Sequence, residues 1–147
     1  MTTLPLQRFV PMLVYKDCPA AIEFLCRAFG FTERSRLAMP DGRIGHAELE
    51  FHDQILTLSS EFEEMGLASP QTLPATHCQI NCRVDDVDEH FETAKSAGAT
   101  IVEAVADQFY GDRIYRAVDL EGTHWIFSQQ IREVSQEELE AAVADMA

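Results

Sequence analysis

The chain has 147 residues, of which 46% are hydrophobic and 24% are charged, the size and composition of one globular domain with a buried core. Its formal net charge is −14, and its only lysines are Lys16 and Lys95, which argues against binding to nucleic acids or anionic membranes. No run approaches the ~18 apolar residues of a membrane span, and no basic segment leads into an apolar run at the N-terminus. We therefore expect a cytoplasmic protein without nucleic-acid or membrane partners.

The first half of the chain predicts the order strand, helix and three strands. Asp17 is a helix cap ahead of Pro19, and Gly30 ends a helix whose apolar residues recur at helical spacing. The segments Pro40-Asp41-Gly42 and His52-Asp53 have the composition of turns between antiparallel strands. The predicted strands cover residues 9–15, 31–38, 44–51 and 54–60.

The second half repeats this order after an acidic, proline-containing connection at residues 61–75. A helix is predicted over residues 87–97, ended by Gly98, and a capping box from Ser135 to Glu138 predicts a short acidic helix over residues 135–146. The predicted strands of this half cover residues 77–84, 100–105, 113–119 and 123–129.

The two halves match at a spacing of 69 residues. Asp17 corresponds to Asp86, and Gly42 to Gly111, each in a similar local sequence. A unit that cannot close a core alone usually packs against its copy. The sequence thus predicts one domain, residues 1–147, built from two modules at residues 8–60 and 76–130.

Strand alternation predicts which side chains share a face of each sheet. In the strand from His77, one set is apolar and should pack against the helices, with its cysteines acting as small buried hydrophobes. This set consists of Cys78, Ile80, Cys82 and Val84. The polar set, His77, Gln79, Asn81 and Arg83, should face solvent or a cavity.

The 69-residue spacing extends this face assignment to the other strands and places Trp125 on the opposite, core side. The cavity lining inferred in this way is His46, Glu48, Thr57, His77, Gln79, Asn81, Arg113 and Tyr115. Arg113 could clamp a carboxylate, since guanidinium offers a planar fork of donors, or could simply pair with the acidic surface. Each of these residues can equally be a solvated strand residue, and His52 and His90 are interpreted as surface residues.

Several local sequences resemble the vicinal oxygen chelate superfamily, which includes glyoxalase I, bleomycin-resistance proteins and extradiol dioxygenases. The resemblance covers residues 9–139, and its phrases are Asp17-Cys18-Pro19-Ala20-Ala21-Ile22-Glu23-Phe24, Ala28-Phe29-Gly30-Phe31, Pro40-Asp41-Gly42-Arg43-Ile44-Gly45-His46-Ala47-Glu48-Leu49 and Asp119-Leu120-Glu121-Gly122-Thr123-His124-Trp125. Phe109-Tyr110-Gly111-Asp112-Arg113 and the tail Val134-Ser135-Gln136-Glu137-Glu138-Leu139 resemble one glyoxalase-like branch. The resemblance implies an α+β fold of two tandem βαβββ modules forming half-open, curved mixed sheets.

The resemblance also implies where a metal would bind. Enzymes of the family hold a divalent ion with four ligands, one from the first and one from the last strand of each module. The matching positions here are Val10, Thr57, Gln79 and Ile126. Only Gln79 is an ordinary ligand, whereas a catalytic ion needs about three protein donors, so we expect neither a metal nor another cofactor.

Two functions remain open from the sequence. The first is a metal-free protein of the bleomycin-resistance type, a homodimer that binds a small organic molecule in sheet-lined cups. The second is a lyase, epimerase or dioxygenase that acts on a small oxygenated substrate at a displaced site around His46 and Glu48, which alternate on one strand face. The sequence leaves the choice between binding protein and enzyme undecided.

Overall fold

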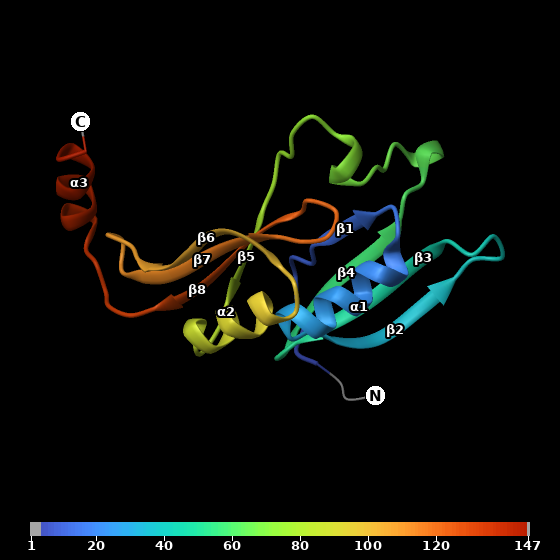
Figure 1. Cartoon of the computed structure of the whole chain (residues 1–147), viewed down its shortest axis with the longest axis horizontal. Helices are drawn as coiled ribbons and strands as arrows, with labels where there is room; N and C mark the ends of the chain where they lie inside the picture. Colours follow the sequence, from blue (N-terminus) through green and yellow to red (C-terminus); the bar gives the residue numbers. More distant parts are fainter. Residues whose placement is uncertain (1–3, 147) are drawn as a thin grey trace.

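The structure of the chain is a computed structural model that describes residues 4–146; residues 1–3 and 147, at the ends of the predicted domain, lie outside the described part. It consists of two βαβββ modules and a C-terminal helix (Figure 1). The first module comprises β1 (Met12–Tyr15), α1 (Cys18–Phe29), β2 (Thr32–Ala38), β3 (Ile44–Phe51) and β4 (Gln54–Ser60). The second comprises β5 (Ile80–Arg83), α2 (Val87–Ser96), β6 (Thr100–Asp107), β7 (Asp112–Val118) and β8 (His124–Gln130).

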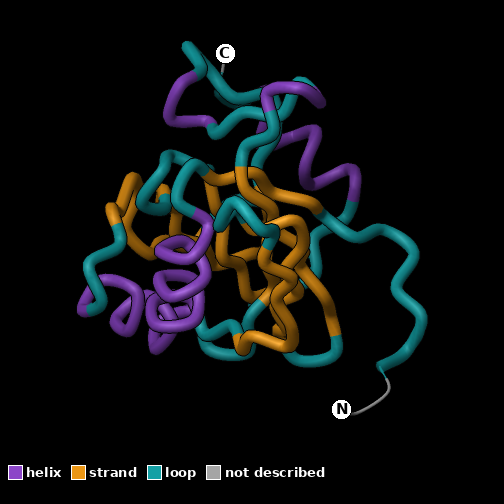
Figure 2. Tube along the Cα trace, turned by 90° about the vertical axis from the view of Figure 1, so that its right-hand side faces the viewer, coloured by secondary structure: helices purple, strands orange, loops and turns teal. Residues whose placement is uncertain are grey.

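Each module forms a four-stranded mixed sheet, with the strand orders β1-β4-β3-β2 and β5-β8-β7-β6. The first and last strands of a module run parallel, and the other neighbours are antiparallel. The predicted α+β fold of two half-open mixed sheets is therefore confirmed. Figure 1 shows the modules side by side, with α1 over the sheet of the first module and α2 near the middle of the molecule, and Figure 2 shows helical segments on one flank of the strands and above them.

The helix ends follow the predicted local chemistry. The Asp17 carboxylate accepts a hydrogen bond from the backbone N–H of Ala20 at 3.2 Å and caps α1, whose other end is closed by Gly30 at φ +84°. The hydroxyl of Ser135 accepts from the N–H of Glu138 and starts α3 (Gln136–Ala144). The connection at residues 61–75 contains two short 3-10 turns, Glu63–Met65 and Pro70–Thr72.

One core extends through both modules. Phe29 at the end of α1 lies 5.3 Å from Trp125 and 4.7 Å from Phe127, measured between ring centroids, and both of these belong to β8. Trp125 is thus on the core side of its sheet, as predicted, and its ring is 1% exposed. Burial of these large rings across the boundary between the modules stabilises their relative position.

The cysteines follow the prediction only in part. Cys18 is fully buried and Cys82 partly buried, and burial raises the pKa of each thiol to about 11. Cys78, predicted to be buried, is exposed, because β5 begins only at Ile80 and the preceding segment leaves the sheet.

Two buried carboxylates in the loop between β7 and β8 join the modules. Asp119 accepts hydrogen bonds from the Tyr15 hydroxyl at 2.5 Å and the Trp125 indole at 3.1 Å. Glu121 accepts from the backbone N–H groups of Lys16 and Asp17, at 2.7 and 2.8 Å. The loop that resembles a family signature therefore also holds the start of α1 in place.

Candidate functional site

The face of each sheet that points away from the helices, here called the open face, carries the polar side chains. In the first module, Met12, Thr57 and Glu48 lie side by side on β1, β4 and β3. In the second, the matching positions on β5, β8 and β7 are Asn81, Ile126 and Arg116. The two open faces thus have opposite charges at the same place in the module.

His46 and Glu48 are neighbours on the open face of the first module. The distance from His46 Nε2 to Glu48 Oε1 is 3.5 Å, with side chains 43% and 34% exposed. Arg34 from β2 approaches the same face, at 3.9 Å from Glu48 and 3.8 Å from Glu50. A carboxylate and an imidazole are therefore accessible to a molecule bound on this sheet, beside a guanidinium that is paired with the two glutamates.

On the open face of the second module, an arginine stands where the first module has a glutamate, and ion pairs are formed around it. Arg116 Nε donates to Glu103 at 2.9 Å, and Arg116 Nη1 donates to the Gln79 amide oxygen at 3.5 Å. Arg83 lies 3.4 Å from Asp112. Asn81 accepts from the hydroxyl of Ser128 at 2.8 Å, so its amide is held in one orientation.

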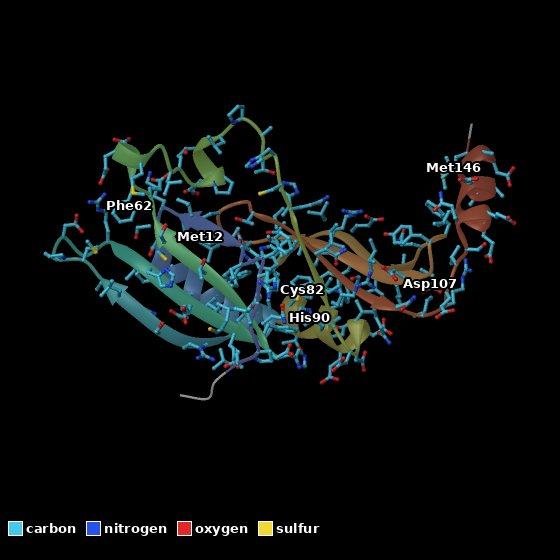
Figure 3. The ribbon with its side chains drawn as sticks, turned by 180° about the vertical axis from the view of Figure 1, so that it is seen from behind. Met12, Phe62, Cys82, His90, Asp107 and Met146 are labelled. Atoms are coloured by element: carbon cyan, nitrogen blue, oxygen red, sulfur yellow. The ribbon has the colours of Figure 1, made fainter. Side chains whose placement is uncertain are left out.

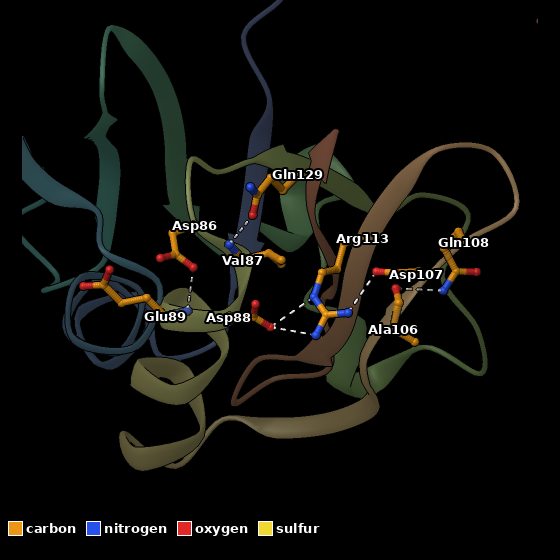
Figure 4. Close-up of polar contacts among 9 residues, drawn as sticks. All are labelled: Asp86, Val87, Asp88, Glu89, Ala106, Asp107, Gln108, Arg113 and Gln129. Atoms are coloured by element: carbon orange, nitrogen blue, oxygen red, sulfur yellow. Dashed lines mark hydrogen bonds and ion pairs between the residues drawn. The ribbon is translucent and has the colours of Figure 1, made fainter. Parts of the chain in front are cut away.

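The face assignment of Arg113 and Tyr115 was wrong. Figure 4 shows Arg113 between Asp88 of α2 and Asp107, with nitrogen–oxygen distances of 3.0 and 2.9 Å. Tyr115 is fully buried against Phe91 of α2, at 5.2 Å between ring centroids. Both residues therefore point to the helix side, and Arg116 occupies the open face instead.

The cause is a change of spacing within the repeat. Met12 corresponds to Asn81 at an offset of 69, but Glu48 corresponds to Arg116 at an offset of 68 (116 − 48). Compared with the first module, the second module has one residue fewer between its helix cap, Asp86, and β6. It has one residue more in the loop between β7 and β8, which restores the offset of 69 at β8. Because side chains alternate along a strand, a shift of one residue moves every side chain of β7 to the other face.

His90 was also wrongly placed on the surface. Its ring is partly buried, with Nδ1 2.6 Å from the Tyr115 hydroxyl and Nε2 2.8 Å from the carbonyl oxygen of Phe29 (labelled in Figure 3). Burial lowers the pKa of His90, an effect that the hydrogen bond to Phe29 opposes. The helical spacing of Val87, His90 and Ala94 was the signal that could have identified a core position.

The remaining predicted residues are spread over several surroundings. Thr57 is buried, and its hydroxyl donates to the carbonyl oxygen of Pro11 at 2.8 Å. His77 lines a pocket of about 320 Å³ between β1 and the connection, together with Met12 and Leu73. Asn81 also borders a different pocket, of about 340 Å³, between the two modules.

The donor chemistry at the four positions implied for a family metal does not fit one. Val10 and Ile126 are aliphatic, and the hydroxyl of Thr57 is already used by the backbone. Within residues 4–146, no three or more His, Cys, Asp or Glu side chains are placed to hold a metal ion. We therefore assign no step to a metal.

Comparison with known proteins places the chain in a family. Residues 7–127 match the sequence profile of the Glyoxalase/Bleomycin resistance protein/Dioxygenase superfamily. The chain belongs to this superfamily. It is 37% identical over 137 residues to an uncharacterised protein of Mycobacterium bovis, covering 91% of this chain and 90% of that protein. A protein of Mycobacterium tuberculosis, also uncharacterised, has the same identity over the same share of this chain and 81% of its own length.

Solved structures agree with the superfamily fold. TioX from Micromonospora sp. ML1 has a TM-score of 0.67 and 33% identity, over 84% of this chain and 98% of TioX. The fosfomycin resistance protein FosX from Listeria monocytogenes, with a TM-score of 0.63 over 92% of this chain and 98% of FosX, is only 16% identical and supports the fold alone. No helix within residues 4–146 is long and apolar enough to cross a membrane.

Proposed function

We propose that this superfamily member binds a small organic molecule on its open faces without the family metal. The observation that carries the proposal is the set of side chains at the four metal positions, which offers one amide and a hydroxyl already bonded to Pro11. A site that keeps the family's curved sheets but lacks its metal donors still retains binding surfaces.

The charges on the two faces indicate what such a molecule would offer. Glu48 and His46 on the first module suit hydrogen-bond donors or a cation, whereas Arg116 on the second suits an oxygen acceptor. Each open face therefore favours a different kind of ligand group.

A thermal-shift screen of small oxygenated molecules, run in the presence of a chelator, tests this proposal. We expect some of these molecules to raise the melting temperature of the protein. The rise should be smaller in Glu48→Gln or Arg116→Gln. Arg113→Gln is the matched control, because Arg113 lies on the helix side and should leave every hit unchanged. Hits that require added metal, or that respond to Arg113→Gln alone, would contradict the proposal.

The His46–Glu48 pair supports an enzyme as the second candidate. At 3.5 Å, the carboxylate can orient the imidazole, so that the ring acts as acid or base toward an oxygenated substrate. This would be lyase, epimerase or dioxygenase chemistry at a displaced site. His46→Gln should then abolish turnover of a hit but retain its binding; hits that are never converted would favour the binding protein.

We further propose that the chain is a homodimer. Phe9 and Met12 are 93% and 68% exposed, and α3 buries none of its residues within the described part of the chain. A second copy would cover such apolar surface and the exposed sheet edges. Sedimentation equilibrium giving the mass of a single 16.5 kDa chain at micromolar concentration would refute this.

The four free thiols are typical of a reducing compartment and support the cytoplasm as the place of action.

A further inference from the structure

The pocket of about 340 Å³ between the modules, here called the seam pocket, includes Asn81 and Arg83 of the second open face in its lining but none of the three side chains on which the proposed function rests. Phe9, Pro11 and Ile55 line it from the first module, and the edge strand β5 and Trp125 line it from the second. Cys82, labelled in Figure 3 between the two sheets, belongs to its lining. His46, Glu48 and Arg116 do not border it.

One wall of the seam pocket is aromatic and rigid. Phe31 lies 5.3 Å from Phe51 and 5.8 Å from Trp125, between ring centroids, and all three rings line the pocket. Phe31 and Trp125 are almost fully buried, so their orientation is fixed by the core. A wall of this kind accommodates a flat or unbranched apolar group.

The rim next to the first module is held by Gln7. Its amide oxygen accepts from the Ile55 N–H at 2.5 Å, and its amide nitrogen donates to the carbonyl oxygens of Ile55 and Phe9, at 3.0 and 2.9 Å. These bonds occupy the Gln7 amide and fix the N-terminal segment as a wall of the pocket. Gln7 is thus a structural residue of the rim.

The polar end of the seam pocket offers hydrogen-bond donors. The amide oxygen of Asn81 is occupied by the Ser128 hydroxyl at 2.8 Å, which leaves the amide N–H groups, for which the described residues provide no partner. Arg83 lies two residues further along β5 and therefore on the same face. Its guanidinium nitrogen Nη1 makes two long contacts, each of 3.4 Å, to the two carboxylate oxygens of Asp112, and the side chain is 65% exposed. Two neighbouring donors without a firm acceptor are the arrangement that binds a carboxylate.

We propose that the seam pocket binds an apolar organic acid, with its hydrocarbon part against Phe31 and Trp125 and its carboxylate reaching past the edge strand β5 to Asn81 and Arg83 on the other face. A pocket of this volume accepts a molecule of the size of an alkylbenzoate. The site does not depend on the open-face binding proposed above, because that proposal rests on His46, Glu48 and Arg116, none of which borders the seam pocket.

The single tryptophan of the chain provides a direct signal, because Trp125 lines the pocket. Titration with 4-butylbenzoate, with excitation of Trp125, should give a saturable fluorescence change. The uncharged 4-butylbenzyl alcohol should bind at least about tenfold more weakly, since it cannot form charge-assisted hydrogen bonds. Equal binding of acid and alcohol, or no saturable change, would overturn the proposal.

Variants separate the seam pocket from other surfaces. Arg83→Gln should weaken 4-butylbenzoate about ten- to a hundredfold and leave the fold intact, because the side chain is mostly exposed. Arg113→Gln, a helix-side arginine of equal charge, should leave the affinity unchanged. Ile55→Phe should fill the pocket and abolish the signal. Equal losses in Arg83→Gln and Arg113→Gln would show a general charge effect and refute the site, whatever the outcome of the open-face screen.

Discussion

Removing the Glu121 carboxylate should destabilise the protein strongly, because this side chain joins three separate parts of the chain. It is 4% exposed and accepts from the backbone N–H groups of Lys16 and Asp17 in the first module. It also accepts from the hydroxyl of Ser69 in the connection, at 2.5 Å. Glu121→Ala would leave two backbone donors and one hydroxyl without their acceptor in a buried place.

Each buried donor that loses its partner lowers the free energy of unfolding by about 1–3 kcal/mol. Ser69 can recover part of this loss by rotating its hydroxyl toward another acceptor. We therefore expect Glu121→Ala to lower the free energy of unfolding by about 3–5 kcal/mol in total. Glu121→Gln keeps one acceptor oxygen and should lose roughly half as much. Urea unfolding followed by far-UV circular dichroism measures the free energy of unfolding. Glu137→Ala on the exposed α3 is the control and should stay within about 0.5 kcal/mol of the unmodified chain. A loss below about 1 kcal/mol for Glu121→Ala would refute the role of this carboxylate.

Three further predictions concern the core and the C-terminal segment. The pKa of His90 is lower in the folded chain than in the unfolded chain, so the unfolded chain binds the proton first as the pH falls. The free energy of unfolding should therefore decrease as the pH drops below about 6.5. His90→Gln should make this pH dependence less steep, and an unchanged slope would contradict the prediction. Gly111 has φ +96°, and Gly111→Ala would bring a Cβ into collision with the Arg132 carbonyl oxygen, so hydrogen exchange should accelerate at residues 131–134; unchanged protection would refute this contact. Trp125→Ala should cost about 3–5 kcal/mol in urea unfolding, and a tolerated substitution would invert the assigned faces.

Local sequence patterns were sufficient for the elements of the fold. The cap at Asp17, the left-handed Gly30 and the bounds of β3 and β4 agree with the prediction, because short-range chemistry determines them. Strand β5 is shorter than predicted at its start: polarity alternates from His77, but sheet pairing begins only at Ile80. Alternation alone does not reveal where a partner strand ends.

The candidate site depended on a longer-range property, the register between strands. A single offset of 69 placed Tyr115 on the open face, whereas one extra residue in the loop after β7 moves it into the core and brings Arg116 to the open face. The sequence does contain a hint of the correct register. Ile114 and Arg116 alternate along β7 with Arg113 and Tyr115, so one of these two sets must face α2 and the other must face away from it. Which of two alternating polar sets faces a helix is decided by tertiary contacts such as the ion pair from Arg113 to Asp88.

The metal content of the purified protein tests the central claim most directly. Elemental analysis after purification without chelator should find no stoichiometric zinc, nickel, manganese or iron, because the four family positions hold Val10, Thr57, Gln79 and Ile126. The open-face ligands should then bind equally well with and without added metal. Near one ion per chain, lost in Gln79→Ala or in a His46→Gln, Glu48→Gln double variant, would contradict the account and favour a metal-dependent enzyme.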